Sequence, residues 1–263
     1  MLQRLYLKLD LDKDFVSKTM LGEAFHGVLM ERLDTNAAYQ LHQQKTNPYS
    51  QFLHIQREDV IWTIQTLTKE AGQQIIMPLT TDKFMNFHLR RISRDIKIIN
   101  KDHSLVPMKD LVNQFYFGKG ERILRIRFLT PTSFKRCGEY IFYPDLRLLF
   151  GSLMRKHSYI CEGSGEEDTE TLDSLVKNTD IVRYDLKSVY SEIGSVRLPA
   201  FCGMVVLKFS GPQSLINYAH FLLRFGEYSG VGIKCALGMG AMRVIDKPDN
   251  RINRGDVLCN KQQ

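Results

Sequence analysis

Hydrophobic side chains along the first hundred residues switch between two spacings. At 4–11 a leucine at every second position alternates with a polar or aromatic residue, which is the period of two expected of a strand with one buried face. At 21–33 the apolar residues recur every three or four positions, as in a helix with one buried side. Later apolar runs predict two strands at 51–56 and 60–68, a short helix at 69–76 and a final strand within 84–99. The resulting order, β-α-β-β-α-β, is that of a ferredoxin-like unit.

The same order of elements returns in the second half of the chain. A glycine-containing segment at 113–121 is predicted to link the two halves. The elements expected after it are a strand at 124–129, a hairpin around 135–138 and a helix from about 144. Two strands at 181–193 and 201–209, a helix from about 212 and a last strand at 241–245 follow. An acidic loop is expected at 161–170.

These patterns predict an α+β protein with two tandem ferredoxin-like (RRM-like) domains. The first is expected at 1–115. The second is expected at 120–246, with a glycine-rich loop near its end, and a polar tail follows at 247–263. The duplication is inferred from the order of elements, because the two halves show no residue-by-residue repeat.

Composition narrows the class of protein. Of the 263 residues, 43% are hydrophobic, which is enough for ordinary globular cores. The net charge of +7 favours a polyanionic partner, because contacts with phosphates release counterions. The five cysteines are widely spaced and contain no C-x-x-C pair, which argues against structural zinc and against a disulfide framework. No apolar segment of signal-peptide or transmembrane type occurs, so the sequence predicts a cytoplasmic protein without a membrane partner.

The segment at 229–244, SGVGIKCALGMGAMRV, has an unusual glycine pattern, G-x-G-x5-G-x-G. Its members are Gly230, Gly232, Gly238 and Gly240, with Lys234 between the two pairs. Backbone amides in such a loop can bind an anion, to which the lysine adds a compact charge. The alternative is that the glycines permit close packing between domains. The loop runs from a helix into a strand, the reverse of a P-loop, so a nucleotide-triphosphate site is excluded.

The opening strand of each unit carries cations on the face opposite its apolar residues. These are Lys8 in the first unit and Arg125 and Arg127 in the second. A sheet with a basic open face suits a phosphate backbone. The alternative interpretation is an ordinary solvated face.

Three segments carry a resemblance to a known family. At 198–244, Leu-Pro-Ala-Phe-Cys-Gly precedes a strand, a helix, the glycine pattern and a strand. The first half contains Phe-His-Gly at 25–27 and Leu-His-Gln-Gln-Lys-Thr-Asn-Pro-Tyr at 41–49. Together they resemble the CRISPR-associated endoribonucleases of the RAMP superfamily, which cut repeat RNA into guide RNAs for antiviral defence. The resemblance spans most of the chain, and its middle is matched by the order of elements alone.

The resemblance implies RNA cleavage without a metal or another cofactor. The ribose 2′-OH attacks the adjacent phosphate in line and leaves a 2′,3′-cyclic phosphate and a 5′-OH, so the site needs a base and an acid. Histidine suits both tasks, because its unperturbed pKa of about 6.5 lies near neutral pH. His42 matches the catalytic histidine of the family, His26 is the second choice, and Lys45 would stabilise charge on the phosphate. The alternatives are a solvated loop histidine and a surface lysine.

One position departs from the family pattern. Some members complete the site with a tyrosine from the first helix, where this chain has Met30. Either Tyr39 or Tyr49 is expected to substitute, or the site relies on histidine and lysine alone.

The partner implied by the resemblance is the repeat segment of CRISPR precursor RNA. The glycine loop with Lys234 is assigned to RNA binding, together with Arg125 and Arg127. These two arginines, with Arg122, Lys135 and Arg136, form a basic cluster suited to the phosphates of an RNA stem.

A monomer or homodimer is expected, with hand-over of guide RNA to a multisubunit effector complex. The alternative function is a non-catalytic RAMP subunit that coats guide RNA in such a complex. A third reading is a domain pair without an RNA role, whose binding would be weak and insensitive to salt.

Overall fold

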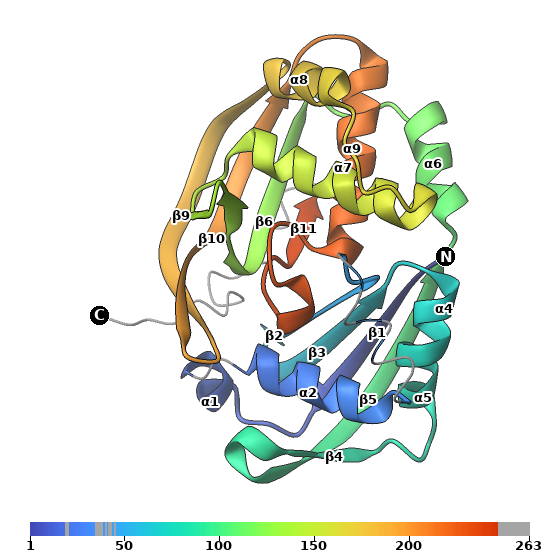
Figure 1. The fold of residues 1–263 in the computed structure, drawn as a ribbon, viewed down its shortest axis with the longest axis vertical. Coiled ribbons are helices and arrows are strands. Elements are labelled where there is room, and N and C mark those ends of the chain that lie inside the picture. Colours follow the sequence, from blue (N-terminus) through green and yellow to red (C-terminus); the bar gives the residue numbers. More distant parts are fainter. Residues whose placement is uncertain (19–20, 35–38, 40, 42–43, 45, 247–263) are drawn as a thin grey trace.

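The computed structural model describes residues 1–18, 21–34, 39, 41, 44 and 46–246. Two antiparallel sheets with helices packed on them follow one another along the long axis of the molecule, and the chain completes the lower sheet before it enters the upper one (Figure 1). The architecture is therefore α+β with tandem units, as the hydrophobic pattern predicted.

The first sheet has the strand order β2-β3-β1-β5-β4. Its strands are β1 (Leu2–Leu9), β2 (Tyr49–Gln56), β3 (Asp59–Thr66), β4 (Asn86–Leu89) and β5 (Arg94–Val106). The helices of this half are α1 (Lys13–Lys18), α2 (Gly22–Arg32), α4 (Lys69–Ala71), the π-helix η1 (Gly72–Ile76), α5 (Met77–Thr80) and the 3-10 turn η2 (Arg90–Ile92). Without the edge strand β4, this is the strand order of a ferredoxin-like sheet, in which the first strand lies between the third and the last.

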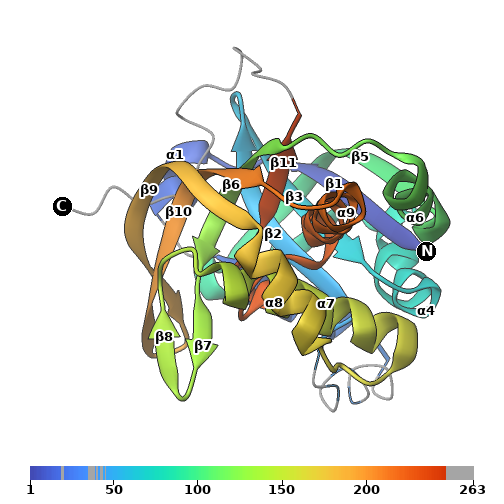
Figure 2. The same ribbon diagram turned by 90° about the horizontal axis from the view of Figure 1, so that it is seen from above.

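The second sheet repeats that arrangement, with the order β11-β6-β10-β9. Its strands are β6 (Ile123–Thr132), β9 (Thr179–Ile193), β10 (Val196–Phe209) and β11 (Met242–Ile245). A separate hairpin of β7 (Phe134–Arg136) and β8 (Glu139–Ile141) projects beside the sheet (Figure 2). The helices of this half are α6 (Met108–Phe117), α7 (Leu146–Glu162), α8 (Thr169–Lys177), α9 (Gln213–Ser229) and the 3-10 turn η3 (Cys235–Leu237).

Three predicted segments differ from the structure. The predicted linker at 113–121 is helical up to Phe117, because α6 extends into it. The single strand expected within 84–99 is a hairpin of β4 and β5. The predicted acidic loop at 161–170 is shorter, since α7 extends to Glu162 and α8 begins at Thr169. The carboxylate of Asp168, which indicated a loop, instead caps α8 by accepting hydrogen bonds from the amides of Glu170 and Thr171 at 3.0 and 3.2 Å.

Each sheet buries its own hydrophobic core against its helices. In the first, Phe25 of α2 packs edge-on against Trp62 of β3, with ring centroids 4.8 Å apart. In the second, Phe128 of β6 packs against Phe201 of β10 at 4.9 Å. A small apolar cluster of Phe52, Leu129 and Ala241 joins the two halves. In addition, Leu2 and Leu67 pack into the core of the second half, and Ala236 packs into that of the first.

His54 of β2 belongs to this contact region and is 6% exposed. Burial, followed by the nearby charges of Arg243 and Arg4, lowers the pKa of His54 from 6.5 to about 3. The folded protein therefore holds His54 neutral, whereas the unfolded chain binds a proton below pH 6.5.

We expect this difference to make the protein less stable in acid. Because the folded pKa is depressed, the stabilisation is complete above about pH 6.5 and is lost as the pH falls towards 3, with about 2 kcal/mol lost at pH 5. Urea unfolding of the protein at pH 7 and pH 5 measures this loss. A His54→Gln variant should lose less stability between the two pH values, and an equal loss in both proteins would contradict the prediction.

In the described part of the chain, no helix combines the length and the apolar character needed to cross a bilayer.

Candidate functional site

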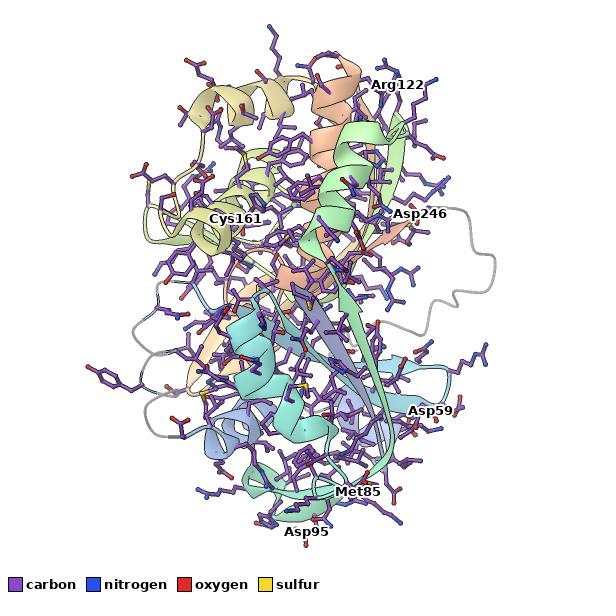
Figure 3. All side chains as sticks on the ribbon, turned by 90° about the vertical axis from the view of Figure 1, so that its right-hand side faces the viewer. Asp59, Met85, Asp95, Arg122, Cys161 and Asp246 are labelled. Atoms are coloured by element: carbon purple, nitrogen blue, oxygen red, sulfur yellow. The ribbon has the colours of Figure 1, made fainter. Side chains whose placement is uncertain are left out.

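A cleft of about 850 Å³ lies between the two halves of the molecule, on the side that carries α2 and α7 (Figure 1). Its walls come from α2, from the start of β2, from α7 with the loop after it, and from the glycine loop that follows α9. Figure 3 shows that Cys161, near the end of α7, and Asp59, at the start of β3, lie on opposite sides of the molecule. The cleft is thus built by segments of both halves that lie far apart in the sequence.

His26 of α2 and Tyr49 of β2 form a hydrogen-bonded pair in the cleft wall. The His26 Nδ1 and Tyr49 Oη atoms are 2.9 Å apart, and the two rings are nearly parallel, at an interplanar angle of 6°. Tyr49 is 1% exposed, and burial raises the pKa of its phenol, so the hydroxyl keeps its proton at neutral pH. The structure thus brings the second-choice histidine to the cleft. Tyr49, one of the two tyrosines expected to complete the site, is buried and contacts this histidine.

Lys156 of α7 lies in the cleft wall and contacts the end of α9. Its Nζ atom donates to the carbonyl oxygens of Ser229 and Gly230 at 3.2 and 2.9 Å and lies 3.0 Å from the Sγ atom of Cys235. A cation is favourable there, because the last carbonyls of a helix carry partial negative charge. Lys156 therefore fastens α7 to the glycine loop and adds a positive charge to the cleft wall.

Acidic side chains balance part of this charge. Glu166 lines the cleft, and the carboxylate of Glu167 forms an ion pair with Arg155 of α7. Arg155 also lines the cleft, so a polyanion that binds there competes with Glu167 for its guanidinium group.

The glycines of the loop are required by close packing. All four have positive φ, at 63°, 76°, 93° and 70° along the chain. A Cβ atom at Gly232 would lie 2.3 Å from the carbonyl oxygen of Ser133, and one at Gly240 would lie 2.0 Å from that of Val231. A Cβ atom at Gly238 would lie 3.0 Å from the Cα atom of Gly22 in the first half, so the close packing between domains that the sequence left as an alternative is present there.

Several amides of the glycine loop donate to acceptors within the protein. The Val231 amide donates to the Gly240 carbonyl, and the Gly240 amide donates to the Pro131 carbonyl. The Ile233 amide donates to the Ser133 carbonyl, and the Gly232 amide donates to the Ser152 hydroxyl. Since these amides are engaged, we expect anion binding by the loop to rest mainly on Lys234. That side chain is exposed, and its own φ is 58°.

Gln51 of β2 ties the glycine loop to α2. It is fully buried, and its Nε2 atom donates to the carbonyl oxygens of Gly22 and Ala236 at 2.8 and 3.0 Å. Its Oε1 atom accepts a hydrogen bond from Trp62 Nε1 at 2.9 Å. The start of α2 approaches the loop so closely that a Cβ atom on Gly22 would lie 2.2 Å from the Leu237 carbonyl oxygen. One side chain thus fixes the position of His26's helix relative to the loop.

The first-choice residues, His42 and Lys45, lie outside the described residues. Their neighbours Leu41, Gln44 and Thr46 line the cleft. Tyr39, the other candidate to complete the site, is 63% exposed and is absent from the described cleft lining.

Arg125 and Arg127 lie on the open face of the second sheet, as predicted. Their strand neighbours Leu124, Ile126 and Phe128 face the core, and neither arginine is part of the described cleft wall. Arg136 belongs to the β7–β8 hairpin and pairs with Asp145 at 3.2 Å. The predicted basic cluster is therefore divided between the sheet and the hairpin.

Sequence reasoning missed Lys156 and Gln51. Gln51 did carry a signal, since the alternation through Leu53 and Ile55 places this polar side chain on the buried face of its strand. Lys156 follows Leu149 and Leu153 on the buried side of its helix, where a lysine needs a partner.

Across the described residues, histidine, cysteine, aspartate and glutamate side chains form no group of three or more that could hold a metal ion.

The fold and cleft define a tandem ferredoxin-like protein whose site spans both units. The structure of a Cas6 product complex matches this chain with a TM-score of 0.75 and 21% sequence identity. The match covers 93% of this chain and 100% of the Cas6 chain. A Cas6-related protein from Pyrococcus furiosus has a TM-score of 0.61 and 11% identity, with 94% and 100% covered. These likenesses confirm the predicted fold.

Sequence comparison identifies the family. The family model for the CRISPR-associated endoribonuclease Cas6 matches residues 126–242. The Cas6 endoribonuclease of Mycobacterium tuberculosis is 36% identical over 246 residues, covering 92% of this chain and 78% of the relative. That of Streptococcus thermophilus is 36% identical over 233 residues, covering 87% and 93%. The chain belongs to the Cas6 family of CRISPR-associated endoribonucleases, as the resemblance predicted.

Proposed function

We propose that the protein cuts the repeat segment of CRISPR precursor RNA by metal-independent transesterification, which leaves 2′,3′-cyclic phosphate and 5′-OH ends. Membership of the Cas6 family supports the substrate and the reaction class. The observation that carries the proposal is a cleft, shared by both halves, whose wall contains His26 and the neighbours of His42.

His42 takes the main role in proton transfer, and His26 is the second histidine of the site. Leu41 and Gln44, on either side of His42, line the same cleft as His26, which supports this pairing. A histidine that exchanges a proton with the 2′-OH or with the leaving 5′ oxygen typically contributes about 10²–10⁴-fold in rate. Lys45 meets the negative charge that develops on the phosphate.

RNA is bound by the glycine loop with Lys234 and by Arg125 and Arg127 on the sheet. Lys234 lies at the cleft, where it can contact the phosphate next to the cut. Both arginines are half-buried on the face of β6 opposite its core side, where a guanidinium group can pair with an RNA phosphate. Product then passes to a multisubunit effector complex, and the protein acts as a monomer or homodimer.

Cleavage of a repeat RNA in EDTA tests the reaction. We expect undiminished cutting at a single position, with a 5′-OH on the downstream product and a cyclic phosphate on the upstream product. Mass spectrometry of both fragments identifies the ends. Cutting that stops in EDTA or leaves a 5′-phosphate would rule out this mechanism, and binding without cutting over a wide pH range would favour a non-catalytic subunit.

A further inference from the structure

The strand β9 forms one edge of the second sheet. Within the described residues it pairs with β10 alone, and Figure 1 shows it along the outer side of the upper half. From Arg183 to Ile193 the pairing with β10 is regular, and a bulge at Val182 ends this stretch. An edge of this kind presents backbone N–H and C=O groups to which another strand can bond.

The side chains of this edge combine exposed aromatic surface with balanced charge. Tyr184 is 68% exposed and Tyr190 is 53% exposed. The strand carries two cations and three carboxylates, although the whole chain has a net charge of +7. A surface for RNA would carry an excess of cations, so the charges of β9 favour a protein partner.

We propose that two copies of this chain associate through β9, as antiparallel strands related by a two-fold axis at Leu186. The inference narrows the choice between monomer and homodimer in the proposed function, and it does not depend on the cleavage reaction. In such a symmetric pair every contact between two different residues occurs twice, once on each side of the axis. A charge pattern that suits one contact therefore stabilises the dimer twice.

The charges along the strand select this register. With the axis at Leu186, Asp185 of each copy faces Lys187 of the other copy, so an ion pair lies on each side of the axis. An axis at Asp185 or at Lys187 would instead bring two like charges face to face. An axis at Tyr184 pairs Asp185 with Arg183, but the bulge beyond Arg183 limits that register to three residues. An axis nearer the turn after β9 forms no ion pair between the two strands.

The side chains that would meet are available for the contact. Asp185 and Lys187 are exposed, and neither has an ion-pair partner among the described residues. Further from the axis, Arg183 faces Val189 of the other copy, so no like charges oppose each other between these positions. Pairing of the two strands therefore breaks no ion pair that the described part of the chain already forms.

The geometry of the dimer determines where its two clefts lie. The two-fold axis is perpendicular to the joined sheets, because the paired strands lie side by side. Each copy therefore keeps α7 on the same face of the joined sheet. Since the cleft lies on the side that carries α2 and α7, both clefts of the dimer face the same way.

Sedimentation equilibrium of the full-length chain without RNA tests the inference. We expect a reversible dimer whose population rises with protein concentration, because the contact is confined to one strand of each copy. Asp185→Lys and Lys187→Asp should each weaken association by about tenfold or more, since each replaces two opposite-charge contacts by two like-charge contacts. The double variant re-forms both ion pairs in reverse and should associate almost as strongly as the wild-type protein. Lys109→Asp is the control, because it makes the same change of charge at an exposed position on α6, on the other side of the upper half (Figures 1 and 2).

The possible outcomes separate this inference from the proposed function. A wild-type chain that stays monomeric up to its solubility limit overturns the inference, and so does a dimer that Lys187→Asp leaves unchanged or that the double variant fails to restore. Single variants that keep the wild-type mass but change the affinity for repeat RNA in opposite directions, beyond the effect of Lys109→Asp, would show that the strand binds RNA instead. A dimer with the expected response to the variants that cuts no repeat RNA contradicts the proposed function alone.

Discussion

Replacing Gln51 by leucine is expected to lower the free energy of unfolding by about 3–6 kcal/mol. Leucine fills a similar volume, but it leaves the carbonyl oxygens of Gly22 and Ala236 and the indole N–H of Trp62 without their partner. Each of these three groups left unsatisfied costs about 1–3 kcal/mol, and burial of the leucine side chain offsets part of the sum. Urea unfolding followed by tryptophan fluorescence measures the loss, since Trp62 is the single tryptophan in the chain.

Gln56→Leu is the matched control for this prediction. Gln56 lies on the same strand and is exposed, so its replacement should change stability by less than about 0.5 kcal/mol. Cleavage by the Gln51→Leu protein should also weaken, because the glycine loop and the helix of His26 lose the side chain that joins them. A Gln51→Leu protein as stable as the Gln56→Leu protein would show that water replaces the amide.

Replacing His42 by alanine is expected to slow RNA cleavage by about 10²–10⁴-fold while RNA binding is retained. The size of the loss follows from removing a group that transfers a proton in the transition state. Alanine removes no more than one charge from a basic surface, so affinity should change little. Single-turnover cleavage gives the rate, and filter binding of repeat RNA at several salt concentrations gives the affinity.

His88→Ala controls for the loss of a histidine. His88 is exposed on β4, where it pairs with Asp95 at 2.8 Å, and it is not part of the cleft wall. This variant should cut at the wild-type rate. A His42→Ala protein with near-normal cleavage would contradict the assignment, and loss of activity in His26→Ala would then move the main role to His26.

The hydrophobic pattern predicted the two sheets because each half carries a clear first strand. The alternation in β1 and β6 reports a buried face directly, and the helical stripes of α2 and α9 report the layer above it. Prediction failed where local chemistry has two uses. Asp168 lies in an acidic segment that is typical of a loop. Aspartate is equally common as the first cap of a helix, and here its carboxylate caps α8, in which apolar residues follow at helical spacing.

The site could be predicted only where its chemistry lies within one short segment. The glycine pattern and the histidine loop are each a single short segment of the sequence, and these two motifs led to the family. The hydrogen bond from Gln51 to Ala236 joins residues 185 positions apart, and the bond from Lys156 to Gly230 joins residues 74 apart. No local pattern contains such pairs, because their members come from distant parts of the chain that meet only in the folded protein. His42 and Lys45 stay predictions.

The position of the glycine loop has a consequence for how the protein is made. The strands of the first sheet end at Val106, so that half can fold while the rest of the chain is still being synthesised. The last wall of the cleft is supplied by residues 229–237, more than a hundred positions later. A ribosome that has not yet passed this point therefore holds a chain whose cleft still lacks one wall.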